Sequence, residues 1–274
     1  MNSFEIVSTP SPLLKADLDA LRDAVRRLES QGFAVRVAQL LGSPIAKGIE
    51  VLPQKYGEVV QSAARTAIEK SLEVAVNTLG KKAPRGPGNG FHKLAAGASG
   101  ALGGFFGLAA LAVELPVSTT IMLRSIAEIA RSHGEDLTNP EGRLACIEVF
   151  ALDTGTRRVG DEAGYYAIRA GLAQIVREAA AQAAERGAAR ESGSAVVRFI
   201  TQVAARFGVT VSDKVLAQAV PVIGAAAGSA INVIFTDYFQ SVATGHFTVR
   251  RLERRYGPQV VRLEYERIRR ELGL

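Results

Sequence analysis

Apolar side chains recur along the chain at the spacing of an amphipathic helix. Near the N-terminus, Leu14, Leu18, Leu21, Val25 and Leu28 follow one another at intervals of four, three, four and three residues. This spacing puts them on one face of a helix, as in helices that pack against a core. No segment alternates apolar and polar residues as a strand does, and no hairpin turn is evident. The pattern predicts an all-α fold, a multi-helix bundle.

Glycine and proline mark where the predicted helices begin and end. Asn139 and Pro140 are typical of a helix start, with Asn as the cap and Pro in the first turn. Gly134 and Gly257 each follow a helical pattern and are expected to end it. We expect helices over residues 12–31, 33–41, 54–79, 116–133, 140–152, 165–186, 195–207 and 259–274, with Pro116 starting or kinking the fourth of them.

A basic segment rich in proline and glycine, KKAPRGPGNG at residues 81–90, is the clearest loop in the chain. It predicts a division into an N-terminal helical region (1–80), a Pro/Gly-rich basic loop (81–93) and a glycine-rich helical core that ends in a basic C-terminal helix (94–274).

Two runs of the core carry no charge: LAAGASGALGGFFGLAALAV at residues 94–113 and VLAQAVPVIGAAAGSAINVIFT at residues 215–236. Each holds glycines four residues apart, a spacing that lets two helix backbones approach closely in a membrane or in a soluble pair. These glycines are Gly100, Gly104, Gly224 and Gly228. Two glycine-rich helices or hairpins are therefore expected to pack at the centre of the bundle.

The same two runs have the length of a membrane-spanning helix, which is about 20 residues. Five glycines weaken insertion of the first run, and Gln218, Pro221 and Asn232 weaken insertion of the second. Three interpretations remain: helices buried against each other, reversible contact with a membrane as hairpins, or a permanent span.

Charge is concentrated at the C-terminal end of this chain of 274 residues, which has a formal net charge of +6. Residues 246–274 contain eight arginines and four glutamates. Such a basic end favours contact with an anionic membrane surface or an acidic partner. Mixing of Glu with Arg at helical spacing is typical of a solvated, ion-paired face and argues against nucleic-acid binding. The basic surface is expected at Arg250, Arg251, Arg254 and Arg255.

A single cysteine, Cys146, excludes an internal disulfide and a cysteine-based zinc site. Its apolar neighbours indicate a small core residue. The N-terminal sequence lacks a basic segment followed by an apolar run, so we expect no signal peptide and a cytoplasmic chain.

Polar residues within apolar surroundings are the best candidates for chemistry. Unpaired charges are costly to bury, so these side chains are expected to pair with one another or to form an acid–base or metal site. For Arg124 the simpler interpretation is a local pair with Glu128, and for His246 it is a capping or surface histidine. The candidate cluster consists of Glu114, Arg124, Glu148, Asp237 and His246.

Recognised catalytic patterns are absent: there is no HExxH, GxSxG, GxGxxG or phosphate-binding loop. His133 lies at a helix end, where histidine usually meets terminal carbonyl groups. We therefore expect no metal and no cofactor, and a non-enzymatic role is favoured over an enzymatic one.

An ordered set of segments resembles the EcsC protein family over residues 33–274. The segments are ELP (114–116), MLRSIAEIA (122–130), HGEDL (133–137), CIEVFAL (146–152), GYYAIRA (164–170), RFGVTVSDK (206–214), AVPVIGAAAGSAINVIFTDYFQ (219–240) and GHFTVRRLERRYG (245–257). The resemblance implies a membrane-associated accessory or regulatory protein, linked to an ABC transporter or an envelope process, with transporter subunits as partners.

Together, these observations predict a cytoplasmic, all-helical protein that associates peripherally with the inner face of the membrane. Two alternatives remain: a hydrolase-type enzyme that uses the buried carboxylate and histidine cluster, and a soluble helical scaffold. The sequence does not specify a substrate or an oligomeric state.

Overall fold

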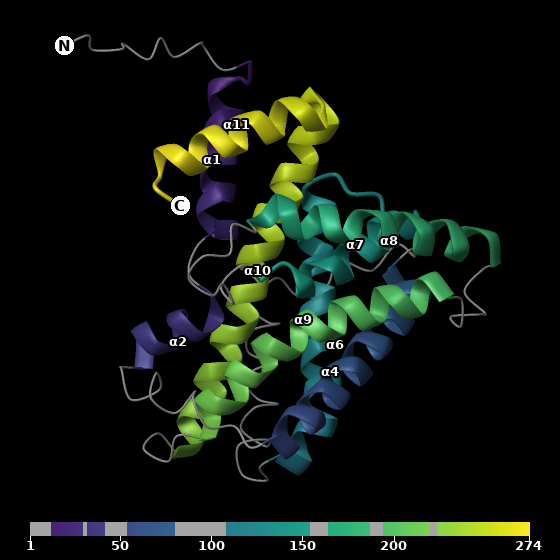
Figure 1. Ribbon diagram of the computed structural model, residues 1–274, viewed down its shortest axis with the longest axis vertical. Helices are drawn as coiled ribbons and strands as arrows, with labels where there is room; N and C mark the ends of the chain where they lie inside the picture. Colours follow the sequence, from purple (N-terminus) through teal and green to yellow (C-terminus); the bar gives the residue numbers. More distant parts are fainter. Residues whose placement is uncertain are drawn as a thin grey trace.

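The structure is a computed structural model that describes residues 12–29, 32–41, 54–79, 108–153, 164–186, 194–219 and 224–274. Within these ranges it contains nine α-helices and no strand, which confirms the predicted all-α bundle (Figure 1). The helices are α1 (Lys15–Glu29), α2 (Phe33–Leu41), α4 (Gln54–Val74), α6 (Leu108–Ser132), α7 (Pro140–Glu148), α8 (Tyr165–Arg186), α9 (Ser194–Ala219), α10 (Gly224–Tyr256) and α11 (Pro258–Glu271). A π-helical turn, η1 (Ala75–Leu79), follows α4, and a 3₁₀ turn, η2 (Val149–Ala151), follows α7.

Several predicted helix ends are confirmed. They depend on capping residues and on the spacing of nearby apolar residues, which can be read from the sequence. Helices α2 and α8 have the expected ends, and α7 begins with the Asn139 side chain accepting a hydrogen bond from the Glu141 amide. The first helix begins at Lys15, later than predicted, and Leu14 is exposed. Its amphipathic face is otherwise as expected, since Leu21, Val25 and Leu28 are buried.

The helix predicted over residues 195–207 was too short, because α9 continues through Gly208 to Ala219. A Cβ atom at position 208 would lie about 2.5 Å from the end of the Gln61 side chain of α4, so the glycine leaves room for this side chain. The second uncharged run is consequently divided between two helices. Residues 215–219 end α9, and residues 224–236 begin α10.

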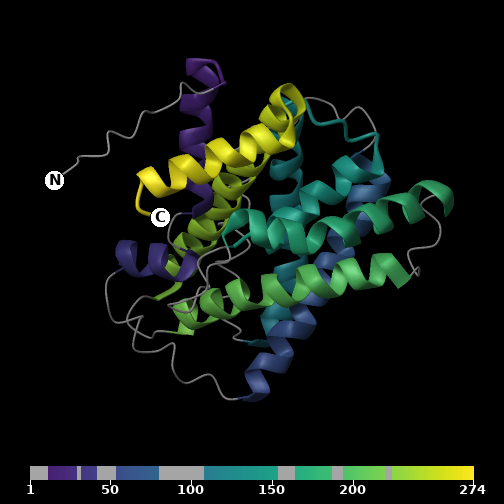
Figure 2. The same cartoon turned by 45° about the horizontal axis from the view of Figure 1, so that its top comes forward.

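The longest helix, α10, extends through the molecule and contacts α1, α6, α9 and α11 (Figure 1). Its 33 residues correspond to a length of about 50 Å. One end of the molecule contains the first turns of α6 and α10 and the last turns of α9. Helix α11 crosses α1 and α10 at the opposite end, as Figure 2 shows from a second direction.

A cluster of phenylalanines forms the centre of the core, although aromatic residues are only 6% of the chain. Neighbouring ring centroids lie 5.0 to 6.1 Å apart, and most of the pairs are edge-on or tilted, which aromatic rings prefer. The cluster joins α2, η2, α9 and α10 and consists of Phe33, Phe150, Phe207, Phe235 and Phe239.

Among the described residues, no helix combines the length and apolar character needed to cross a bilayer. Most of the first uncharged run, including Gly100 and Gly104, lies outside the described residues, as do the loop at 81–93 and His92. The predicted division into domains is therefore still a prediction. Gly224 and Gly228 lie in the first turns of α10.

Candidate functional site

The five candidate polar residues do not meet at one place. Arg124 is exposed on α6 and forms no ion pair with Glu128 within the described part of the chain. Asp237 is exposed on α10, with its carboxylate 3.7 Å from the guanidinium of Arg36. Glu114 lies at one end of the bundle, whereas Glu148 and His246 are buried near its middle. The five residues predicted to form one cluster therefore lie in three places: on the surface, at one end of the bundle and near its middle.

Glu114 forms a buried ion pair with Lys214, and we call these two residues with Asn232 the end cluster. The Lys214 ammonium donates a hydrogen bond of 2.7 Å to Oε1 of Glu114, and the Asn232 amide donates one of 3.0 Å to the same oxygen. Lys214 is 0% exposed, and its ammonium also lies 4.9 Å from the centre of the Phe235 ring. Burial lowers the pKa of Lys214, while the Glu114 charge acts in the opposite direction.

The end cluster brings together parts of the chain that are distant in sequence. Glu114 directly follows the first uncharged run, Lys214 directly precedes the second, and Asn232 lies within the second. The described ends of both runs therefore meet at one end of the molecule. Sequence analysis missed Lys214, although a lysine at the boundary of an uncharged run was the signal that would have indicated it.

Exposed apolar side chains lie beside this cluster on α6. Val113, the last residue of the first uncharged run, is 72% exposed, and Val117 is 49% exposed. Val113 and Val117 lie on consecutive turns of α6, so together they form a small exposed apolar surface beside the end cluster.

His246 is fully buried on α10, so its interpretation as a capping or surface residue was wrong. Its Nδ1 lies 2.9 Å from the Tyr165 hydroxyl, and the backbone amide of Tyr165 donates a 3.0 Å hydrogen bond to Glu29. The Tyr265 hydroxyl donates to the same Glu29 oxygen at 2.9 Å. The packing of α1, α8 and α11 around α10 therefore encloses His246.

Glu148 and His246 share two charged neighbours, Arg169 and Arg250. Burial lowers the pKa of His246 well below its usual value, and both arginines act in the same direction. Burial raises the pKa of Glu148, and here the same arginines oppose the shift. His246 is accordingly a neutral imidazole at neutral pH.

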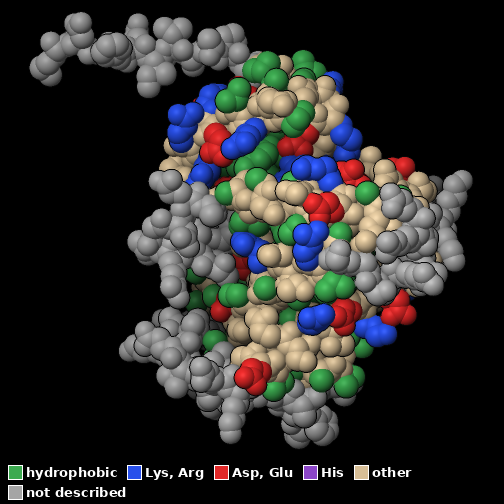
Figure 3. All heavy atoms as spheres, turned by 45° about the vertical axis from the view of Figure 1, so that its right-hand side comes forward, with side chains coloured by type: hydrophobic (Ala, Val, Ile, Leu, Met, Phe, Trp, Pro, Cys, Tyr) green, Lys and Arg blue, Asp and Glu red, His purple; other side chains and the backbone are tan. Residues whose placement is uncertain are grey.

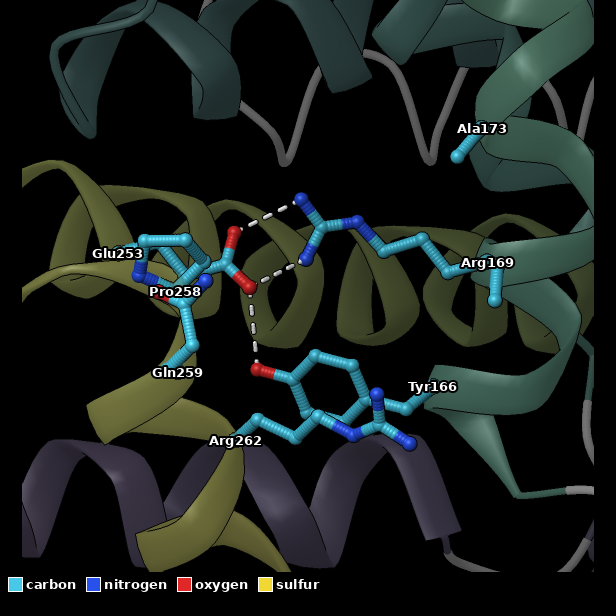
Figure 4. A pocket seen from close by; sticks show the side chains of 8 residues that line it. Tyr166, Arg169, Ala173, Glu253, Pro258, Gln259 and Arg262 are labelled. Atoms are coloured by element: carbon cyan, nitrogen blue, oxygen red, sulfur yellow. Dashed lines mark hydrogen bonds and ion pairs between the residues drawn. The ribbon is translucent and has the colours of Figure 1, made fainter.

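A surface hollow of about 270 Å³ lies between α8 and the start of α11, and we call it the α8–α11 hollow (Figure 4). In its wall, the Arg169 guanidinium makes two parallel 2.7 Å hydrogen bonds with the Glu253 carboxylate. The Tyr166 hydroxyl donates a 3.0 Å hydrogen bond to Glu253, and the Arg262 guanidinium lies over the Tyr166 ring. The lining residues are Tyr166, Arg169, Ala170, Ala173, Glu253, Pro258, Gln259 and Arg262.

Comparison with protein families gives a match to the EcsC protein family over residues 15–252. The chain belongs to the EcsC protein family. Comparison with curated proteins gives no match, and comparison with solved structures gives none either. The family match includes the whole end cluster of this EcsC protein, whereas Arg262 and the other α11 residues of the hollow lie beyond it.

The arginines of the predicted basic surface are paired in this EcsC protein. Arg250 and Arg254 both bind Glu135, with shortest distances of 2.5 and 2.6 Å. Burial opposes ionisation of Glu135, but the two arginines outweigh it and lower the pKa of Glu135. Arg251 and Arg255 lie 3.7 and 2.9 Å from Asp17. On the face shown in Figure 3, basic side chains lie beside acidic ones rather than in a separate field.

Cys146 and His133 of the EcsC protein have structural roles, one in the core and one at a helix end. Cys146 is buried, as predicted, and burial raises the pKa of its thiol. His133 lies at the end of α6, where its Nδ1 is 2.8 Å from the Ile129 carbonyl oxygen, as expected for a helix-end histidine. Across the described ranges, His, Cys, Asp and Glu side chains do not gather in a group that is able to hold a metal ion.

Proposed function

We propose that this EcsC protein is a peripheral membrane protein with an accessory role at the cytoplasmic face of the inner membrane. It contacts lipid through the end of the bundle formed by α6, α9 and α10. The observation that supports this proposal is the end cluster, in which Glu114, Lys214 and Asn232 hold the ends of the two uncharged runs together.

Charge neutralisation makes this end suitable for contact with lipid. The Glu114 and Lys214 charges cancel within a buried pair, so neither has to be carried into the bilayer alone. Outside the pair, Val113 and Val117 expose apolar surface that a bilayer would cover. The attraction expected here is therefore hydrophobic, at about 25 cal/mol for each Å² of apolar surface removed from water.

The arginines contribute little to this contact because of where they lie. Arg250 follows Asn232 by 18 residues on the same helix, which corresponds to about 27 Å. Both surfaces would touch one flat membrane only if α10 lay along it. Arg250 and Arg254 are also already bound to Glu135, which reduces the attraction that they offer to anionic lipid.

An accessory role is favoured over a catalytic one because the five candidate polar residues lie apart. The link to an ABC transporter or an envelope process, with transporter subunits as partners, comes from the family resemblance. The proposed accessory role therefore serves such a transporter or envelope process.

Flotation with lipid vesicles tests the membrane contact. We expect the wild-type protein to float with phosphatidylcholine vesicles, and Val113→Glu to reduce the bound fraction at least fivefold, because it places a charge on the contact surface. Leu263→Glu is the matched control, since Leu263 is also 72% exposed but lies on α11 at the other end. It should bind as the wild type does.

Washing distinguishes the two sources of attraction. We expect the bound protein to resist high salt, because apolar contact is not screened by ions. Release by salt would assign the contact to the arginines and contradict the proposal, as would equal loss of binding in Val113→Glu and Leu263→Glu. Failure of the wild-type protein to bind vesicles would defeat the membrane role altogether.

A further inference from the structure

Two arginines that line the α8–α11 hollow have N–H groups for which no described residue is an acceptor. Arg169 uses two of its five N–H groups on Glu253, and no described residue accepts from the other three. Arg262 is exposed, and within the described chain its guanidinium contacts only the Tyr166 ring. Glu253, the carboxylate of the lining, already accepts three hydrogen bonds from Arg169 and Tyr166.

The charges of the lining favour an anion. The lining contains two guanidinium groups, those of Arg169 and Arg262, and one carboxylate, that of Glu253. Behind Arg169, burial raises the pKa of Glu148, which opposes ionisation of this second carboxyl group. Apolar surface from Ala170, Ala173 and Pro258 completes the wall of the hollow.

We propose that the α8–α11 hollow binds the phosphate group of a small, water-soluble molecule. Arg262 supplies a planar fork of donors that matches two phosphate oxygens, and Arg169 supplies its remaining N–H groups from the wall. The Arg169–Glu253 pair holds the Arg169 guanidinium in place before the ligand arrives, which reduces the entropy lost on binding. A volume of about 270 Å³ lies just below the usual range of ligand sites, so the hollow suits only a small ligand.

The position of the hollow favours a soluble source of phosphate over a lipid headgroup. Glu253 follows Asn232 by 21 residues on α10, so the hollow lies about 30 Å from the end cluster. With the end cluster at the membrane, the hollow stands away from the headgroups. This choice of source rests on the proposed function, whereas phosphate binding itself does not.

Calorimetric titration with inorganic phosphate and with glycerol 3-phosphate, without membranes, tests the site. We expect saturable binding by the full-length protein and at least a tenfold weaker affinity for Arg262→Ala. Arg262→Lys should give an intermediate affinity because it keeps the charge but loses the fork. Arg124→Ala is the control, since it removes an exposed arginine from α6 and should bind phosphate as the wild type does.

Three outcomes would overturn the proposal. The first is no saturable binding of either probe, and the second is equal weakening in Arg262→Ala and Arg124→Ala, which would indicate attraction to net charge alone. The third is that the wild-type protein binds phosphatidic acid vesicles but no soluble phosphate, and that Arg262→Ala loses the vesicle binding. This result would assign the site to a lipid headgroup. Because the titrations contain no membrane, failure of the membrane role would leave their result interpretable.

Discussion

Asp213 is half-buried on α9, close to the carboxylate of Asp153. Asp153 is buried and accepts hydrogen bonds from the hydroxyl groups of Thr210, at 2.8 Å, and Tyr238. Burial of Asp213 and, to a smaller extent, the negative charge of Asp153 raise the pKa of Asp213 from 3.8 to about 6. The folded protein thus holds a proton on Asp213 at pH values where the unfolded chain has released it.

This shift predicts a specific dependence of stability on pH. Because the pKa of Asp213 is higher in the folded protein than in the unfolded chain, the free energy of unfolding falls as pH rises from about 4 to 6. Above pH 6, where Asp213 is ionised in both states, this loss of stability is complete and constant. We expect Asp213→Asn to raise the free energy of unfolding at pH 7.5 by about 1 to 2 kcal/mol, allowing for the partial exposure of the side chain.

Urea unfolding at a series of pH values measures the effect. Asp213→Asn should flatten the slope of stability between pH 4 and 6. Asp19→Asn, which removes an exposed charge from α1, should leave that slope as in the wild type. An unchanged slope in Asp213→Asn would show that Asp213 ionises in the folded protein as it does in the unfolded chain.

At the scale of single elements, the contact between α1 and α10 depends on a glycine within α10. A Cβ atom at position 245 would lie 2.8 Å from Cγ of Leu28 and 3.2 Å from the backbone oxygen of Ala24. Both atoms belong to α1, so Gly245 lets the two helices approach more closely than any side chain would allow. The usual cost of glycine in a helix is offset by this packing.

Replacing this glycine is therefore expected to destabilise the protein even though alanine favours helices. Gly245→Ala should lower the free energy of unfolding by about 1 to 3 kcal/mol, as overpacking in a core does. Gly171→Ala on α8 is the control, because a Cβ atom there meets nothing within 4 Å, and it should stabilise by up to about 1 kcal/mol. Stabilisation by both substitutions in thermal unfolding would contradict the close contact.

At the scale of the whole molecule, the Glu114–Lys214 pair joins residues 100 positions apart and closes one end of the bundle. Removing one member of a buried pair leaves the other charge without compensation, at a cost of about 3 to 5 kcal/mol. Replacing both by apolar residues removes that penalty together with the attraction.

We therefore expect Lys214→Met to lower the free energy of unfolding by about 3 kcal/mol. The combination with Glu114→Leu should recover most of this loss, short of the cost of removing the acceptor of the Asn232 amide. Arg65→Met, which breaks the exposed Arg65–Glu69 pair, should cost less than about 1 kcal/mol. Chemical denaturation checks all of these variants. A double variant as unstable as Lys214→Met would show that the ion pair stabilises the fold beyond its desolvation cost.

Prediction from sequence succeeded for the elements and the fold class, and it succeeded only in part for the site. The ends of α2 and α8 and the start of α7 followed from capping residues and helical spacing, whereas α7 ends at Glu148 and not at residue 152. The candidate list included Glu114, Glu148 and His246, which are buried polar residues. It missed Lys214 and Arg169 because their partners lie 100 and 84 residues away in the sequence.

The helices and the all-α fold of this EcsC protein were evident from the chain alone, because helix formation depends on spacing and capping within a few residues. Pairing between helices depends instead on which faces meet across the bundle, and an apolar face does not specify its partner. Tertiary packing therefore enclosed His246, dispersed the five candidate polar residues and placed Lys214 against Glu114. It also brought α8 and α11 together around the hollow that Arg169 and Arg262 line.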